Sequence, residues 1–143
     1  MYQLLLLIHI TCFALWMGAV AASLLVVRTL EPRLTGVEGD AAADAGLLRA
    51  YIRREVKFVD VVFAGVLISG IVLAHVYYGW TPWVFLKIGL FVAQFAATMA
   101  YIHRFIRSLS YPCSPQLYRR WYGLFGLSLS FFLLTLLVVF FGR

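Results

Sequence analysis

The sequence predicts an all-α integral membrane protein, folded as an antiparallel bundle of four transmembrane helices. Hydrophobic residues make up 64% of its 143 residues and charged residues only 13%, whereas soluble domains carry about 25% charged residues. The apolar residues gather in four runs, each close to the roughly 20 residues that cross a bilayer as a helix. We therefore expect a single membrane domain over residues 1–143, with spans at about 4–27, 58–79, 83–106 and 121–142.

The first span carries one ionisable side chain, His9. On a helix, His9 shares one stripe with Cys12 and Trp16. A polar group inside a bilayer costs free energy unless it faces protein, water or a ligand. What His9 faces is therefore the first functional question that this sequence raises.

The connection between the first two spans, residues 28–57, is polar and basic. Pro32 and Gly36 suit a loop, and apolar residues then recur at helical spacing from position 47 to position 52. We expect a short amphipathic helix here on the cytoplasmic side, with its basic face solvated or turned to lipid headgroups.

The second and third spans are predicted to form a tight antiparallel hairpin. Thr81 suits the N-cap of the third span and Pro82 its first helical position. Within the third span, four polar side chains lie close to one line on the helix and are expected to face the bundle: Lys87, Gln94, Thr98 and Tyr101.

The basic residues indicate the orientation of the chain. Six lie in residues 28–57 and four in residues 104–120, whereas the turn at residues 80–83 has none. Positively charged loops stay in the cytoplasm, so both termini are expected outside. Because the basic residues do not share one soluble face, the net charge of +6 indicates topology and lipid contact rather than nucleic-acid binding.

This orientation places His9, His75 and Lys87 at one depth, roughly 8–9 Å below the outer surface at about 1.5 Å per helical residue. No Asp or Glu follows Asp60 and none precedes Glu31. Only the C-terminal carboxylate could therefore approach Lys87 from outside. Two interpretations stay open: Lys87 extends to the outer headgroups, or it neutralises a carboxylate of a bound ligand, such as a porphyrin propionate.

A neutral imidazole is a good ligand for haem iron, and helix bundles hold haem between facing helices. His9 and His75 are the candidate axial ligands, and Trp16 and Gln94 are further candidates for cofactor binding. The alternative for His9 is a core histidine bonded to a neighbouring group. Sequence motifs for other chemistries, such as CxxC, HExxH or a glycine-rich phosphate loop, are absent.

Four short motifs then occur in order along the chain: His9-x6-Trp16-x-Gly18, Trp83-x3-Lys87, Tyr101-x-His103-Arg104 and Arg119-Arg120. Their order and spacing resemble the HemJ-type protoporphyrinogen IX oxidases, which are small bacterial four-span proteins. The spans are also similar to the related CopD-like domain of copper-resistance proteins, where a histidine precedes a Trp-x-Gly in the same way.

The HemJ resemblance implies a haem b protein of the bacterial inner membrane that oxidises protoporphyrinogen IX and passes electrons to a quinone or a respiratory-chain partner. It implies that His9 binds the iron and that Lys87 and Arg120 are catalytic. One motif departs from the family, because Gly126-Leu127 stands where an Asn-Glu pair is expected.

This departure keeps two alternatives open. One is a non-catalytic haem-binding or structural subunit of a respiratory complex. The other is a CopD-like protein in which His9 and His75 bind copper. The oligomeric state is open as well, with a homo-oligomer among the arrangements considered.

Overall fold

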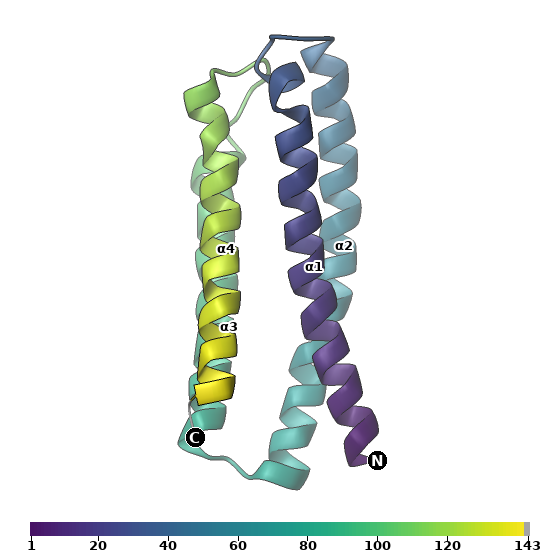
Figure 1. Ribbon diagram of the computed structural model, residues 1–143, viewed down its shortest axis with the longest axis vertical. Coiled ribbons are helices and arrows are strands. Elements are labelled where there is room, and N and C mark those ends of the chain that lie inside the picture. The colour runs from purple at the N-terminus through teal and green to yellow at the C-terminus, as the bar shows by residue number, and fades with distance from the viewer. Residues whose placement is uncertain (142–143) are drawn as a thin grey trace.

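The computed structural model describes residues 1–141 as a bundle of four long antiparallel helices (Figure 1). Each helix is long and apolar enough to cross a membrane. The prediction of an all-α four-helix membrane protein is therefore confirmed. The helices are α1 (Tyr2–Leu34), α2 (Ala41–Leu73), α3 (Pro82–Tyr101) and α4 (Pro115–Phe141), and π-helical turns extend α2 (η1, Ala74–Tyr78) and α3 (η2, Ile102–Ile106).

The first two helices extend well beyond the predicted spans, which leaves only residues 35–40 as their connection. Asp40 caps α2, because its side chain accepts hydrogen bonds from the backbone N–H groups of Ala42 and Ala43 at 2.9 and 3.3 Å. The short helix expected between the first two spans is present as the first part of α2 rather than as a separate element. Its residues are helical but continuous with the second span, since no proline or glycine interrupts the chain between Gly46 and Gly65.

The helices are arranged as two pairs. α1 packs along α2, α3 packs along α4, and contacts between α1 and α4 join the pairs, as Figure 1 shows. α2 and α3 are joined by the short turn at residues 79–81, but their backbones do not pack along their lengths. Aromatic side chains bridge them instead, with the rings of Phe63 and Phe91 stacked at 4.5 Å between centroids. The backbones of the two helices in the predicted hairpin thus approach each other only at the turn.

The predicted polar stripe of α3 does face the bundle. Gln94 is buried and its Nε2 donates to the backbone oxygen of Ser128 at 3.5 Å, while the hydroxyls of Thr98 and Ser128 lie 3.4 Å apart. Thr81 is the N-cap of α3 and Pro82 is its first residue, as predicted. These contacts supply polar partners between α3 and α4 in an otherwise apolar bundle.

The end of the bundle that holds the loops at residues 35–40 and 107–114 has the best-packed core. Tyr118 is fully buried there, and its hydroxyl donates to the backbone oxygen of Val27. A second core cluster around Trp16, Val62 and Phe132 lies further along the bundle. Both core clusters lie away from the opposite end, where α1 begins and α4 ends.

Close packing of α1 on α2 depends on Gly65. A Cβ atom at this position would lie 2.6 Å from Sγ of Cys12 on α1, whereas a Cβ at Gly89 on α3 would meet nothing within 4 Å. The Gly65/Ser69 small-residue pair therefore lies in the α1–α2 interface, which is the use such pairs have in membranes.

We predict that Gly65→Leu lowers the free energy of unfolding by about 1–3 kcal/mol, because the larger side chain forces α1 and α2 apart. Gly89→Leu is the matched control, with the same substitution in open space. Equilibrium unfolding of both variants in mixed detergent micelles measures the difference. Equal stability of the two variants would contradict the close packing at Gly65.

Candidate ligand-binding site

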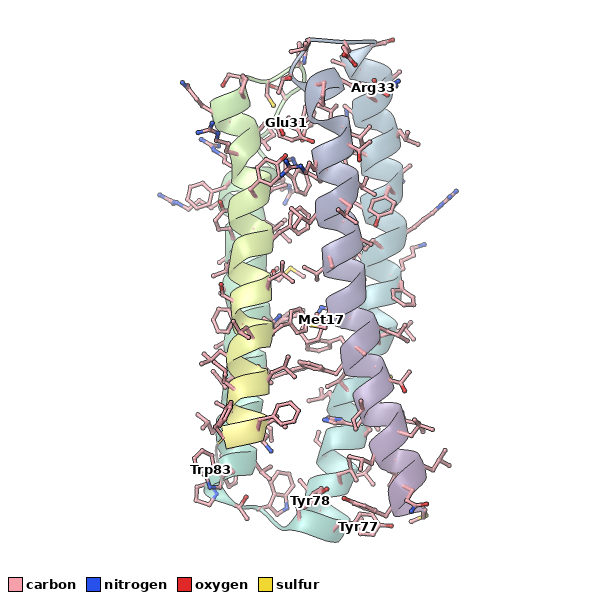
Figure 2. All side chains as sticks on the ribbon, in the orientation of Figure 1. Met17, Glu31, Arg33, Tyr77, Tyr78 and Trp83 are labelled. Atoms are coloured by element: carbon pink, nitrogen blue, oxygen red, sulfur yellow. The ribbon has the colours of Figure 1, made fainter. Side chains whose placement is uncertain are left out.

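A cavity of about 430 Å³ lies between the helix pairs, near the start of α1 and the end of α4. All four helices contribute to its wall, which is mostly apolar, and its volume is typical of small-molecule sites. Figure 2 shows Tyr77, Tyr78 and Trp83 at this end of the bundle, and Glu31 and Arg33 at the other. The polar side chains in the wall are His9, Tyr78, Lys87 and Thr135.

His9 is fixed by α2. Its Nδ1 atom lies 3.1 Å from the backbone oxygen of Val66 and 3.0 Å from Oγ of Ser69. A carbonyl oxygen can only accept a hydrogen bond, so Nδ1 carries the proton. The Ser69 hydroxyl in turn donates to the backbone oxygen of Gly65. In the neutral ring, Nε2 is then left with a free lone pair, and it has no hydrogen-bond partner among residues 1–141.

Gly70 provides the space for this ring. A Cβ atom at position 70 would lie 3.0 Å from Cε1 of His9, which is tighter than ordinary van der Waals contact. The sequence signal for this part of the site is the run of small residues at positions 65, 69 and 70. The sequence analysis did not identify Ser69 and Gly70 as residues that position His9.

Lys87 lines the same cavity from α3. Within the part of the chain that the structure describes, the one ion pair joins Arg33 to Asp44 at 3.3 Å, close to the opposite end of the bundle. Lys87 makes neither an ion pair nor a hydrogen bond to any described residue. The structure therefore brings together an imidazole lone pair and an unpaired ammonium group, as the predicted depths of His9 and Lys87 suggested.

Two other candidates lie outside the wall of this cavity. His75 is exposed on η1 and does not line the cavity. Arg120 lies near the start of α4, where its Nη1 donates to the backbone oxygen of Phe105 at 3.4 Å and its guanidinium lies 5.7 Å from that ring's centroid. The roles predicted for His75 and Arg120 stay predictions, and neither residue shares the cavity with Lys87.

Trp16 and Gln94 also lie apart from the cavity wall. Trp16 is buried, with edge-to-face contacts to Phe91 at 5.1 Å and to Phe132 at 4.7 Å. Because Phe91 lines the cavity, Trp16 supports the wall from behind. Gln94 contacts α4 through Ser128, so its polar group is already used in helix packing.

The donor set favours a particular kind of ligand. Residues 1–141 contain no group of three or more His, Cys, Asp or Glu side chains that could hold a metal ion. The cavity instead combines a single nitrogen donor, a cation and an apolar wall. This combination suits an apolar molecule with an anionic group. It also suits a metal complex of this kind, in which the bound molecule itself supplies most of the ligands to the metal.

Comparison with known proteins gives no relative: no family model, no curated protein and no solved structure matches the chain. Fold and site together define a four-helix membrane protein with a ligand-sized cavity at one end.

We predict that His9 is protonated at Nδ1 in the ligand-free protein. Isotope labelling of the histidine nitrogens, followed by NMR in detergent micelles, should show a proton on Nδ1 and none on Nε2. Ser69→Ala should speed exchange of this proton with water about fivefold, because one of its two acceptors is lost. Ser130→Ala, at an exposed serine of α4, should leave exchange unchanged. A proton on Nε2 would contradict the assigned geometry.

Proposed function

We propose that this protein is a haem b-binding membrane oxidoreductase, which oxidises protoporphyrinogen IX to protoporphyrin IX and passes the electrons to a membrane acceptor such as a quinone. The observation that carries the proposal is the free Nε2 of His9, which shares an apolar cavity with the unpaired Lys87. The electron-transfer chemistry and the substrate are taken from the resemblance to HemJ-type proteins.

The residues of the cavity fit a haem. A porphyrin supplies the equatorial nitrogen ligands itself, so a single histidine suffices where a bare metal ion would need a larger cluster. Iron-binding histidines usually donate their other ring N–H to a carboxylate or a backbone carbonyl, and His9 donates Nδ1–H to Val66. Lys87 offers a cation to a propionate, and the apolar wall suits the macrocycle.

Each side chain then has a defined role. Haem, when bound, supplies one-electron redox chemistry. His9 holds the iron from α1, and Ser69 and Val66 keep its ring oriented. Lys87 neutralises a propionate of haem or of the porphyrin substrate, and the apolar wall keeps water away. The distribution of basic residues supports a location of this cavity in the outer half of the membrane, with both termini outside. The bacterial inner membrane is taken from the resemblance to HemJ-type proteins.

A second candidate is a haem protein without the oxidase activity, such as a subunit of a respiratory complex. Two observations favour it. Arg120 contacts Phe105 rather than the cavity, and Gly126 has open space around it where the family pattern has a polar residue. A copper site shared by His9 and His75 has less support, since His75 does not reach the cavity wall.

We predict that the purified protein shows a Soret absorption band and that His9→Ala removes it. His103→Ala is the control, because His103 is exposed and bonded to Arg107 at the other end of α3. His75→Ala should keep the band, and a changed low-spin spectrum in that variant would identify His75 as a second ligand. Haem retained at wild-type level in His9→Ala, with helicity unchanged, would disprove the site.

We predict that Lys87→Met weakens haem or porphyrin binding about tenfold or more, because a charge-assisted contact to a carboxylate is lost. Lys57→Met is the matched control, since Lys57 is the chain's other lysine and is exposed on α2. Titration of the haem-free protein with haem measures the affinity.

The same variants separate the two candidate functions when they are expressed in a strain that lacks protoporphyrinogen oxidase. Rescue by the wild-type chain but not by Lys87→Met supports the enzyme. A protein that binds haem without rescuing growth supports the non-catalytic candidate. Full affinity and full rescue by Lys87→Met would mean that Lys87 reaches the headgroups and has no ligand.

A further inference from the structure

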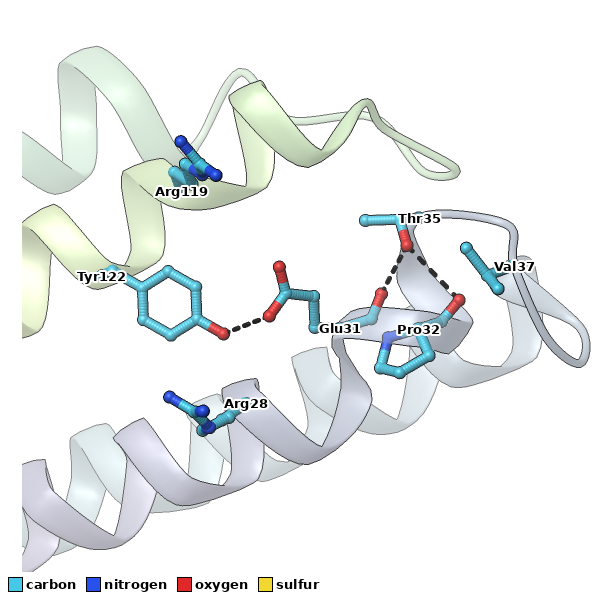
Figure 3. A pocket seen from close by; sticks show the side chains of 7 residues that line it. All are labelled: Arg28, Glu31, Pro32, Thr35, Val37, Arg119 and Tyr122. Carbon is cyan, nitrogen blue, oxygen red and sulfur yellow. Dashed lines mark hydrogen bonds between the residues drawn. The ribbon is translucent and has the colours of Figure 1, made fainter.

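A second pocket, of about 740 Å³, lies at the other end of the bundle, between the end of α1 and the start of α4. Its wall differs from that of the first cavity, because five of its seven lining residues carry a charged or hydroxyl group. Figure 3 shows these side chains on the two helices. They include Arg28, Glu31 and Thr35 from the α1 side and Arg119 and Tyr122 from α4.

Only part of the hydrogen-bonding capacity of this pocket is used. The Tyr122 hydroxyl donates to Oε2 of Glu31, and Figure 3 shows this pair between Arg28 and Arg119. Oε1 of Glu31 has no partner among residues 1–141. The guanidinium groups of Arg28 and Arg119 likewise make no ion pair or hydrogen bond within the described chain. The pocket therefore offers two cations and one acceptor carboxylate oxygen.

The pocket lies where a membrane changes from acyl chains to headgroups. Arg28 is the first charged residue after the apolar run at residues 4–27, and Arg119 lies just before the uncharged stretch of α4 from Trp121 to Phe141. Basic pockets between transmembrane helices at this level bind lipid headgroups. Lipid is therefore the ligand source that the position favours.

We infer that this pocket binds the headgroup of an aminophospholipid, phosphatidylethanolamine. Arg28 and Arg119 hold its phosphate, since guanidinium groups bind phosphate oxygens through charge-assisted hydrogen bonds. Oε1 of Glu31 accepts from its primary ammonium group, while Tyr122 holds the carboxylate in place through Oε2. The site is separate from the cavity at His9 and does not depend on the proposed function.

The carboxylate between the arginines makes the pocket selective. A headgroup with only negative charge, as in phosphatidylglycerol, offers Glu31 hydroxyl donors but no ammonium group, and it brings a like charge near the carboxylate. Phosphatidylcholine has the phosphate and a positive charge, but its methylated nitrogen has no N–H to donate. Phosphatidylethanolamine alone among these three supplies both a phosphate for the arginines and an ammonium N–H for Glu31.

Native mass spectrometry of the full chain in detergent tests this, with the three lipids carrying identical acyl chains. The first phosphatidylethanolamine should bind about tenfold more tightly than the first phosphatidylcholine, the difference expected for one hydrogen bond between charged groups. Equal binding of all three lipids would overturn the proposal.

Two sets of variants locate the site. Glu31→Gln should reduce the preference for phosphatidylethanolamine over phosphatidylcholine to about threefold or less, because a neutral acceptor makes a weaker bond. The double variant Arg28→Gln, Arg119→Gln should weaken both lipids. The matched controls are Glu38→Gln and Arg54→Gln, whose side chains are exposed outside the pocket. Circular dichroism checks that each variant is folded, and an undiminished preference in folded Glu31→Gln would disprove the assignment.

Soluble O-phosphoethanolamine separates the lipid from a free metabolite of the same chemistry. It should compete only at concentrations far above that of the lipid, because it lacks the acyl chains that partition beside α1 and α4. Competition at equal concentration would mean that the pocket takes a soluble aminophosphate, and the assignment to lipid would be wrong.

Discussion

The hydrogen bond from Nδ1 of His9 to the backbone oxygen of Val66 determines how the cavity end of the molecule is built. It places the imidazole of α1 against α2, and the small residues at positions 65 and 70 let the two helices approach closely enough to make it. It also decides which ring nitrogen is free. Only Nδ1 of His9 has hydrogen-bond partners. The lone pair of Nε2 faces an apolar cavity, where it can bind a ligand.

The two ends of the bundle differ in how well large side chains fill the space between the helix pairs. At the end with the longer loops, Tyr118, Trp121 and Leu34 fill the space between α1 and α4, and the Tyr118 hydroxyl is bonded to Val27. Beyond the cluster around Trp16 and Phe132, the described residues form no further buried core cluster toward the other end, and a cavity is left there. The polar stripe of α3 follows the same division, since Gln94 and Thr98 bond to Ser128 while Lys87 further along the helix faces the cavity.

The sequence predicted the helix number, the inward face of α3 and the common depth of His9 and Lys87, because hydropathy and helical rise determine these directly. It did not predict that His75 lies outside the cavity wall. Depth follows from counting residues, but the direction of a side chain depends on the phase of the helix, and His75 lies off the helix face on which Gly70 and Ala74 line the cavity. Contacts between distant residues, such as Ser69 with His9 and Tyr122 with Glu31, left no periodic signal, since each depends on how two helices are placed.

The positions of the acidic residues make the two pockets differ in charge. All six carboxylate side chains belong to the first 60 residues, and Glu31 is the one that lies in the second pocket. A bound molecule at that end can therefore meet both signs of charge, which suits a zwitterion. At the cavity the protein supplies a cation without a carboxylate side chain, and an ammonium group in apolar surroundings is costly unless an anion or water reaches it. An anion or water must therefore reach Lys87, and the proposed dianionic macrocycle, which also needs a nitrogen ligand, would satisfy Lys87 and His9 together.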